Sequence, residues 1–279
     1  MSNRASTVPP GPSEAEDSLV LADGRVLAVR RYGRKGTGGA TPLVLHFHGG
    51  AFTAGDLESG ACLARLLAAA GAVVVSVAYP LAPEHRFPEA VEAGYAALEV
   101  LHRQRRKFAG ARAQLFVAGE EAGGNLAAAV ALVARDRAGP PLAGQILVAP
   151  MLDPCTGTPS QREAMDCEAM ACKWAEGWRL YLRGPMDAEH PYAVPARALR
   201  LAGLPPTLIL TGQDDAMRDE ALAYAKRLAA AGIAVTSQKL PLQTGWPDSL
   251  ADPAPVDCPC TREVTHQLRA FFEATVPPS

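Results

Sequence analysis

The sequence of 279 residues predicts an α/β fold with a mostly parallel central sheet flanked by helices. Short apolar runs alternate with helical runs of about ten to fifteen residues, the pattern of βαβ crossovers. A hairpin signal precedes this series, and a long segment interrupts it before its last third. The hydrophobic content of 48% supports one medium-sized domain with a sizeable core.

Two strands begin the predicted domain, which we place at 18–279. Residues 1–17 are rich in Pro, Ser and Glu and are expected to form a flexible tail. The following segment, SLVLADGRVLAVRRY, predicts two strands around the turn at residues 22–24. These strands should pair antiparallel at one edge of the sheet, and the apolar run 43–47 supplies a third strand.

From about residue 59 onward, helices and strands alternate. The predicted strands are AVVVSVAY, AQLFVAG, QILVAP, TLILTG and AVTSQKL. The predicted helices are CLARLLAAAG, residues 88–104, a run from Ala122, residues 216–231, and a last helix ending at Phe271-Phe272. Because right-handed crossovers place parallel strands side by side, both faces of the sheet should be covered by helices.

The long segment between QILVAP and TLILTG predicts a lid. It has about fifty-five residues, more than a crossover requires. Within it Trp174, Trp178 and Tyr181 recur among charged residues, as in an amphipathic helix. We predict a small helical lid over residues 153–190, covering the carboxyl ends of the strands where open α/β sheets bind ligands. Ordinary helix packed on the core is the alternative.

Composition and motif patterns exclude several classes of function. A net charge of −2 and a pI near 6.3 predict no basic surface for nucleic acid. No signal peptide or apolar span of eighteen or more residues is evident, so we expect a cytoplasmic protein without a membrane partner and with reduced cysteines. Neither cysteine nor histidine spacing predicts a metal site, and the glycine-rich turns lack nucleotide-binding patterns, so no cofactor is expected.

Two glycine-rich turns carry the candidate chemistry. The sequence HGGA, residues 48–51, follows a strand, and its backbone N–H groups can turn toward a negatively charged oxygen. The sequence GEEAG, residues 119–123, has the G-x-x-x-G spacing of a strand-to-helix elbow. We predict that Gly49, Gly50 and Ala122 donate the N–H groups of an oxyanion hole.

With these turns the chain resembles the hormone-sensitive-lipase-like family of α/β-hydrolases. FHGGAFTAGD is similar to the family's HGG oxyanion loop, YPLAPEH to its YRLAPEH segment, and GEEAGGNLA to its GDSAGGNLA elbow. The resemblance extends from about residue 18 to the C-terminus, and the longer N-terminal cap of the family is expected to be largely missing. It implies the α/β-hydrolase fold with a small helical lid.

Position by position, the resemblance places the family's catalytic acid at Asp215, its nucleophile at Glu121 and its histidine at Thr244. It therefore implies that the serine and the histidine of the triad are replaced, which closes the usual acyl-enzyme route. A carboxylate nucleophile at Glu121, or His266 in the last helix as a displaced base, are alternatives.

Three hypotheses follow for Glu121. In the main one it is a general base beside the oxyanion hole, with Asp215 sharing or tuning the proton, for elimination, isomerisation or cyclisation in specialised metabolism. In the second it activates water to hydrolyse an ester, lactone or epoxide. In the third the site is catalytically dead: the carboxylate fills the hole and the pocket only binds a ligand, as in the plant gibberellin receptors of this family.

The position of the Glu121 carboxylate discriminates among these hypotheses. A carboxylate within about 3 Å of the N–H pair favours a dead or binding site, whereas one directed into an open cavity favours a base. The predicted substrate-binding side chains are His48, Phe52 and Trp246. The expected partner is a small carbonyl compound, and a homodimer is left open.

Overall fold

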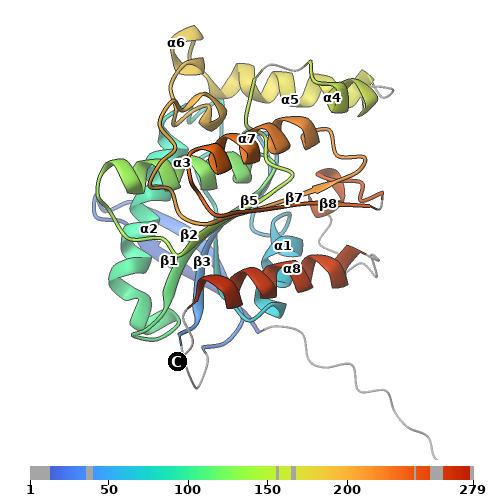
Figure 1. Cartoon of the computed structure of the whole chain (residues 1–279). Coiled ribbons are helices and arrows are strands. Elements are labelled where there is room, and N and C mark those ends of the chain that lie inside the picture. Colours follow the sequence, from blue (N-terminus) through green and yellow to red (C-terminus); the bar gives the residue numbers. More distant parts are fainter. Residues whose placement is uncertain are drawn as a thin grey trace, which may run out of the picture.

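A single eight-stranded sheet forms the centre of the molecule, in the order β1-β2-β4-β3-β5-β6-β7-β8 (Figure 1). The structure is a computed structural model that describes residues 13–35, 40–154, 157–164, 168–241, 243–251 and 260–276. The strands are β1 (Glu14–Val20), β2 (Val26–Tyr32), β3 (Pro42–Phe47), β4 (Val73–Val77), β5 (Gln114–Glu120), β6 (Gly144–Val148), β7 (Thr207–Gly212) and β8 (Val235–Leu240).

The direction of strand pairing confirms the predicted α/β fold class. β1 and β2 pair antiparallel, β2 joins β4 antiparallel, and all other neighbours in the sheet pair parallel. The predicted boundary at residue 18 is wrong by four residues: β1 begins at Glu14, inside the segment predicted as a tail, because residues 14–17 pair with β2. Residues 1–12 of that segment lie outside the described residues.

Helices cover both faces of the sheet (Figure 1). Helices α1 and α8 pack on one face, and α2, α3 and α7 pack on the other, each against its own cluster of buried apolar residues. The helices are α1 (Ala61–Ala69), α2 (Glu89–Phe108), α3 (Ala122–Asp136), α4 (Pro159–Ala164), α5 (Glu168–Tyr181), α6 (Pro185–Ala188), α7 (Arg218–Ala230) and α8 (Cys260–Thr275), with short 3-10 turns η1 (Pro195–Arg197) and η2 (Asp248–Ala251).

The burial of each element follows from its sequence. Strands β4, β6 and β7 are buried along their whole length, as expected of apolar runs that are covered on both faces. Helix α2 is amphipathic and carries Glu89 and Glu92 in its first turn and basic residues in its last, which complements the helix dipole. Helix α3 is buried from Ala122 to Ala134 because its small residues allow close packing on the sheet.

The segment between β6 and β7 contains the helices of the predicted lid. Helices α4, α5 and α6 lie on the same side of the sheet as α3 and α7, and farther from the sheet than these two (Figure 1). Trp174, Trp178 and Tyr181 of α5 are buried and belong to the same apolar cluster as α2 and α3. Among the described helices, none combines the length and the apolar character that a membrane span requires.

Candidate active site

A tight turn between β5 and α3 presents Glu121 at the carboxyl end of the sheet. Glu121 has φ 51° and ψ −118°, a strained conformation for a residue with a side chain. The turn requires glycine on both sides: a Cβ on Gly123 would lie 2.0 Å from the carbonyl oxygen of Phe47, and one on Gly119 would lie 2.2 Å from that of Gly123. The elbow predicted from the G-x-x-x-G spacing is therefore present in the backbone.

The carboxylate of Glu121 lies against the loop that follows β3. Its Oε2 accepts hydrogen bonds from the backbone N–H of Gly50 and, at 3.1 Å, from that of Ala51. Glu121 is buried, and only 4% of its side chain is exposed. Two of the N–H groups that an oxyanion hole would direct at a substrate are thus bonded to the protein's own carboxylate.

Helix α5 contacts the other oxygen of the same carboxylate. The indole Nε1–H of Trp174 donates to Glu121 Oε1 at 2.5 Å, and the ammonium Nζ of Lys173 lies 3.4 Å from that oxygen. Lys173 also lies 2.8 Å from Asp248 Oδ1 of η2. Burial lowers the pKa of Lys173, but attraction to the carboxylates of Glu121 and Asp248 outweighs it and raises that pKa above its ordinary value.

The predicted donors differ in part from those observed. Of the three predicted oxyanion-hole donors, Gly50 donates to Glu121 and Gly49 donates to Glu120 at 3.2 Å, while the second backbone donor to Glu121 is Ala51 and not Ala122. The reason is geometric: the Glu121 side chain extends toward the β3 loop, away from its own following N–H. Ala51 was not predicted as a donor, because nothing in the amino-acid sequence indicates that this alanine has a positive φ of 49°.

A buried chain of polar residues supports the loop from behind. His46 of β3 lies 2.9 Å from Ser76 Oγ and 2.8 Å from Glu120 Oε2, and the other oxygen of Glu120 accepts the Gly49 N–H. The order Ser76, His46, Glu120 is that of a serine-histidine-acid triad, but Ser76 and His46 are both 0% exposed. No substrate reaches this serine, so these three hydrogen-bonded side chains orient the β3 loop and do not supply a nucleophile.

No hydrogen bond joins Asp215 to Thr244. The resemblance places the catalytic acid of the family at Asp215 and its histidine at Thr244. The Thr244 hydroxyl and N–H donate instead to Asp214 Oδ1, at 3.0 and 2.8 Å. Asp215 Oδ1 accepts the Met217 N–H at 2.9 Å, while its buried Oδ2 has no hydrogen-bond partner. Burial raises the pKa of Asp215 to about 7.

No histidine contacts Glu121 or Asp215. All six histidines of the sequence lie in the described part of the chain, and none donates to or accepts from Glu121 or Asp215. His266 is exposed on α8, so the alternative of a displaced base finds no support there. No hydrogen bond joins Asp215 to Glu121 among the described residues, so proton sharing between them stays a prediction.

The three predicted substrate-binding side chains lie in packed surroundings. His48 bonds to the carbonyl of Gly49 at 2.7 Å and stacks on Tyr79, and burial lowers the His48 pKa. Phe52 stacks on Tyr181 with ring centroids 4.0 Å apart, and Trp246 is buried against the α1 and α8 side of the sheet. None of these three side chains lines the cavity beside Glu121, because each packs against other residues of the fold.

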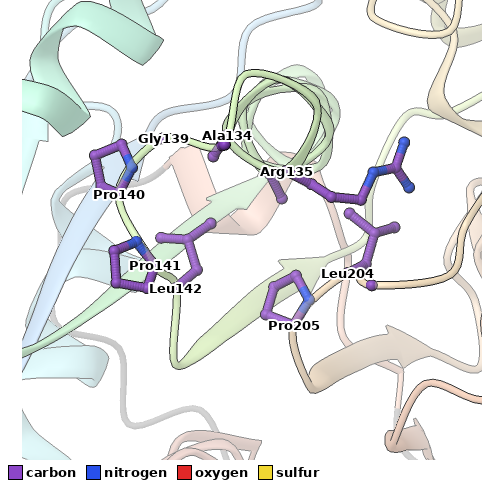
Figure 2. A pocket seen from close by; sticks show the side chains of 11 residues that line it. Ala134, Arg135, Gly139, Pro140, Pro141, Leu142, Leu204 and Pro205 are labelled. Atoms are coloured by element: carbon purple, nitrogen blue, oxygen red, sulfur yellow. The ribbon is translucent and has the colours of Figure 1, made fainter.

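That cavity has a volume of about 210 Å³ and lies between the β3 loop, the elbow, helix α5 and the turn η2. Its walls are made by Gly49, Gly50, Ala54, Gly55, Ser59, Glu120, Glu121, Lys173, Pro247, Asp248 and Ala251. A larger cavity of about 450 Å³, lined by Arg135, Pro140, Pro141 and Leu204 among others, lies where the chain enters β6 and β7 (Figure 2). This is the amino end of those strands, opposite to the elbow, so we assign the site to the smaller cavity.

Metal-ligating groups do not gather at this site. Within the described ranges no cluster of three or more His, Cys, Asp or Glu side chains has the geometry to hold a metal ion. Cys260 is disulfide-bonded, so the expectation of reduced thiols is wrong at this position.

Comparisons with known proteins agree with this geometry. A family model described as the alpha/beta hydrolase fold matches residues 44–244. Esterase LipI of Mycobacterium tuberculosis (strain ATCC 25618 / H37Rv) is 39% identical over 198 residues, which cover 70% of this chain and 62% of that protein. Gibberellin receptor GID1 of Oryza sativa subsp. japonica is 34% identical over 201 residues, covering 68% and 56%.

Solved structures extend the similarity over nearly the whole chain. The thermostable esterase from Pseudomonas putida ECU1011 superposes with a TM-score of 0.83 at 29% identity, covering 96% of this chain and 85% of that one. The alignments with mycobacterial relatives span less than two thirds of the relatives' own length. The match over residues 44–244, together with the elbow and the sheet order, shows that this chain belongs to the α/β-hydrolase fold family.

Proposed function

We propose that this chain is an esterase-family protein whose elbow no longer hydrolyses esters and whose site binds a small molecule without converting it. One observation carries the proposal: the carboxylate of Glu121 already has four donors, from Gly50, Ala51, Trp174 and Lys173. An ionised carboxylate offers about four lone-pair positions. Glu121 therefore has no free acceptor position with which to take a proton from water or substrate.

The groups that a serine hydrolase uses do not meet at this site. The elbow position holds a carboxylate instead of a hydroxyl, and no histidine contacts it to relay a proton. The backbone N–H groups of Gly50 and Ala51 would have to lose Glu121 before they could stabilise a substrate oxyanion. This arrangement fits the hypothesis of a dead site that binds a ligand.

Hydrolysis through a Glu121-activated water is the second candidate. The relatives named above include esterases, and Glu121 lines the cavity, so a water molecule there would lie near a carboxylate. The same relatives favour hydrolysis over elimination, isomerisation or cyclisation, and no contact of Glu121 favours those reactions. General-base catalysis of either kind would first require the carboxylate to leave its four donors.

The rate of p-nitrophenyl acetate hydrolysis across pH, measured for the wild type beside Glu121→Gln, tests the proposal. Glutamine keeps the size of the side chain and removes the basic oxygen. We expect neither protein to exceed the buffer rate, while a serine esterase of the family, assayed in parallel, does. Activity in the wild type that is lost in Glu121→Gln would replace our proposal with the water-activation mechanism.

A further inference from the structure

The cavity beside Glu121 has few polar groups that are free to bind a ligand. Glu121 is occupied by its four donors, and Glu120 is bonded to His46 and to the loop backbone. Much of the remaining wall consists of glycine, alanine and proline, which offer no side-chain hydrogen bonds. The polar side chains left to consider are Ser59, Asp248 and Lys173.

Of these, Lys173 has an unused donor. An ammonium group carries three N–H donors and no acceptor. Two of the three are used by Glu121 and Asp248, at 3.4 and 2.8 Å. The Lys173 side chain is 40% exposed and lines the cavity, so its third N–H is available to a bound molecule. Ser59 Oγ, by contrast, already donates to the Asp56 carbonyl at 3.0 Å.

The charges around the cavity determine which kind of ligand can accept the free N–H of Lys173. Two carboxylates, Glu121 and Asp248, face one ammonium group, Lys173, which leaves an excess of negative charge. A carboxylate ligand would be repelled by this excess. A ligand ammonium would be attracted by the excess of negative charge, but it carries no acceptor to offer the free N–H of Lys173. A neutral carbonyl oxygen meets neither obstacle.

We propose that Lys173 selects the ligand: its third N–H donates to the oxygen of a small neutral carbonyl compound bound in this cavity, in place of the backbone N–H groups that Glu121 occupies. This inference rests on the proposed binding function of the site. The volume of about 210 Å³ limits the ligand to a compact ketone, lactone, ester or amide.

Three probes of similar size and different charge test this assignment: γ-butyrolactone, butyrate and butylammonium, each titrated into the full chain and followed by amide NMR shifts. We expect the lactone to bind with a dissociation constant on the order of millimolar, because so small a molecule makes few contacts. Lys173→Met, which keeps the length of the side chain, should weaken lactone binding at least about five-fold. Lys239→Met, an exposed lysine of β8, should leave it unchanged.

A second variant guards against a fold defect in Lys173→Met. Ala54 is exposed and lines the cavity, so Ala54→Leu narrows the space without removing a hydrogen bond and should also abolish lactone binding. Equal lactone binding by the wild type and Lys173→Met, tighter binding of butyrate or butylammonium, or no shifts with any probe would each overturn the inference. Appearance of 4-hydroxybutyrate in the same spectra would instead contradict the proposed function, because the lactone would have been hydrolysed.

Discussion

The indole Nε1 of Trp174 lies 2.5 Å from Oε1 of Glu121, so helix α5 is hydrogen-bonded to the elbow. The other oxygen of the same carboxylate holds the β3 loop through Gly50 and Ala51. One side chain therefore joins three elements: the elbow, the β3 loop and helix α5. If residue 121 is the nucleophile position, as the family resemblance implies, the same glutamate accounts for the missing hydroxyl and for the occupied backbone N–H groups.

The Trp174 contact should contribute measurably to stability. Trp174→Phe removes the donor and leaves a buried carboxylate with one partner fewer, which should lower the free energy of unfolding by about 2 kcal/mol, as for hydrogen bonds to charged groups. Urea unfolding measures this. Trp178→Phe is the matched control, since Trp178 is buried on the same helix and has no such bond to Glu121. Equal losses in the two variants would show that volume alone matters.

Restoring the triad should restore esterase activity. Asp215 Oδ2 is buried and has no partner, as expected if the histidine that it would orient is missing. Glu121→Ser combined with Thr244→His should hydrolyse p-nitrophenyl acetate about 10²-fold faster than Glu121→Ser alone, the usual contribution of a positioned base. A double variant that is folded yet no faster than the single one would mean that the β8-to-α8 loop does not place residue 244 correctly.

Asp215 should make the protein less stable as pH rises toward neutrality. Its pKa is about 7 in the folded chain and near 3.8 when unfolded, so only the unfolded state ionises between these values. Stability should therefore fall by at most roughly 1.4 kcal/mol per pH unit from pH 4 to 7 and then level off. Asp215→Asn should remove this slope, measured as urea unfolding between pH 5 and 8.

Asp214→Asn is the control, because the pKa of Asp214 is shifted in the opposite direction to that of Asp215. Burial raises the pKa of Asp214, but hydrogen bonds from Thr244 and Gly245 outweigh it and lower that pKa. The stability that Asp214 contributes is present above its unfolded pKa and is lost only at acid pH. Its variant should differ from the wild type by a constant amount between pH 5 and 8. A constant difference for Asp215→Asn as well would rule out the raised pKa of Asp215.

The elbow should not tolerate a side chain at Gly123. Gly123→Ala would place a Cβ 2.0 Å from the backbone oxygen of Phe47, and because neither strand nor helix can move freely, we expect a loss above about 3 kcal/mol. Gly184→Ala, where nothing lies within 4 Å of the added Cβ, should be nearly neutral. Thermal unfolding of the two variants compares them directly. A mild effect at Gly123 would mean that the turn relaxes easily.

Much of the fold was predictable because its signals are local. The apolar runs of β4, β6 and β7 and the apolar faces of α2 and α7 are properties of neighbouring residues, and each was found at its predicted place. The start of β1 was missed because Glu14 and Asp17 are exposed and polar, so only pairing with β2 makes them a strand. The hydropathy of residues 14–17 does not show that they pair with β2.

The sequence alone, through the family resemblance, predicted which catalytic side chains are replaced. Glutamate at the elbow and threonine at the histidine position can be read without a structure, and so can the glycines that a tight turn needs. The tertiary structure decided where the Glu121 carboxylate points and which groups occupy it: Trp174 and Lys173 come from a helix more than fifty residues away in the chain. A carboxylate's role depends on the donors around it, and those are assembled only when distant segments pack together.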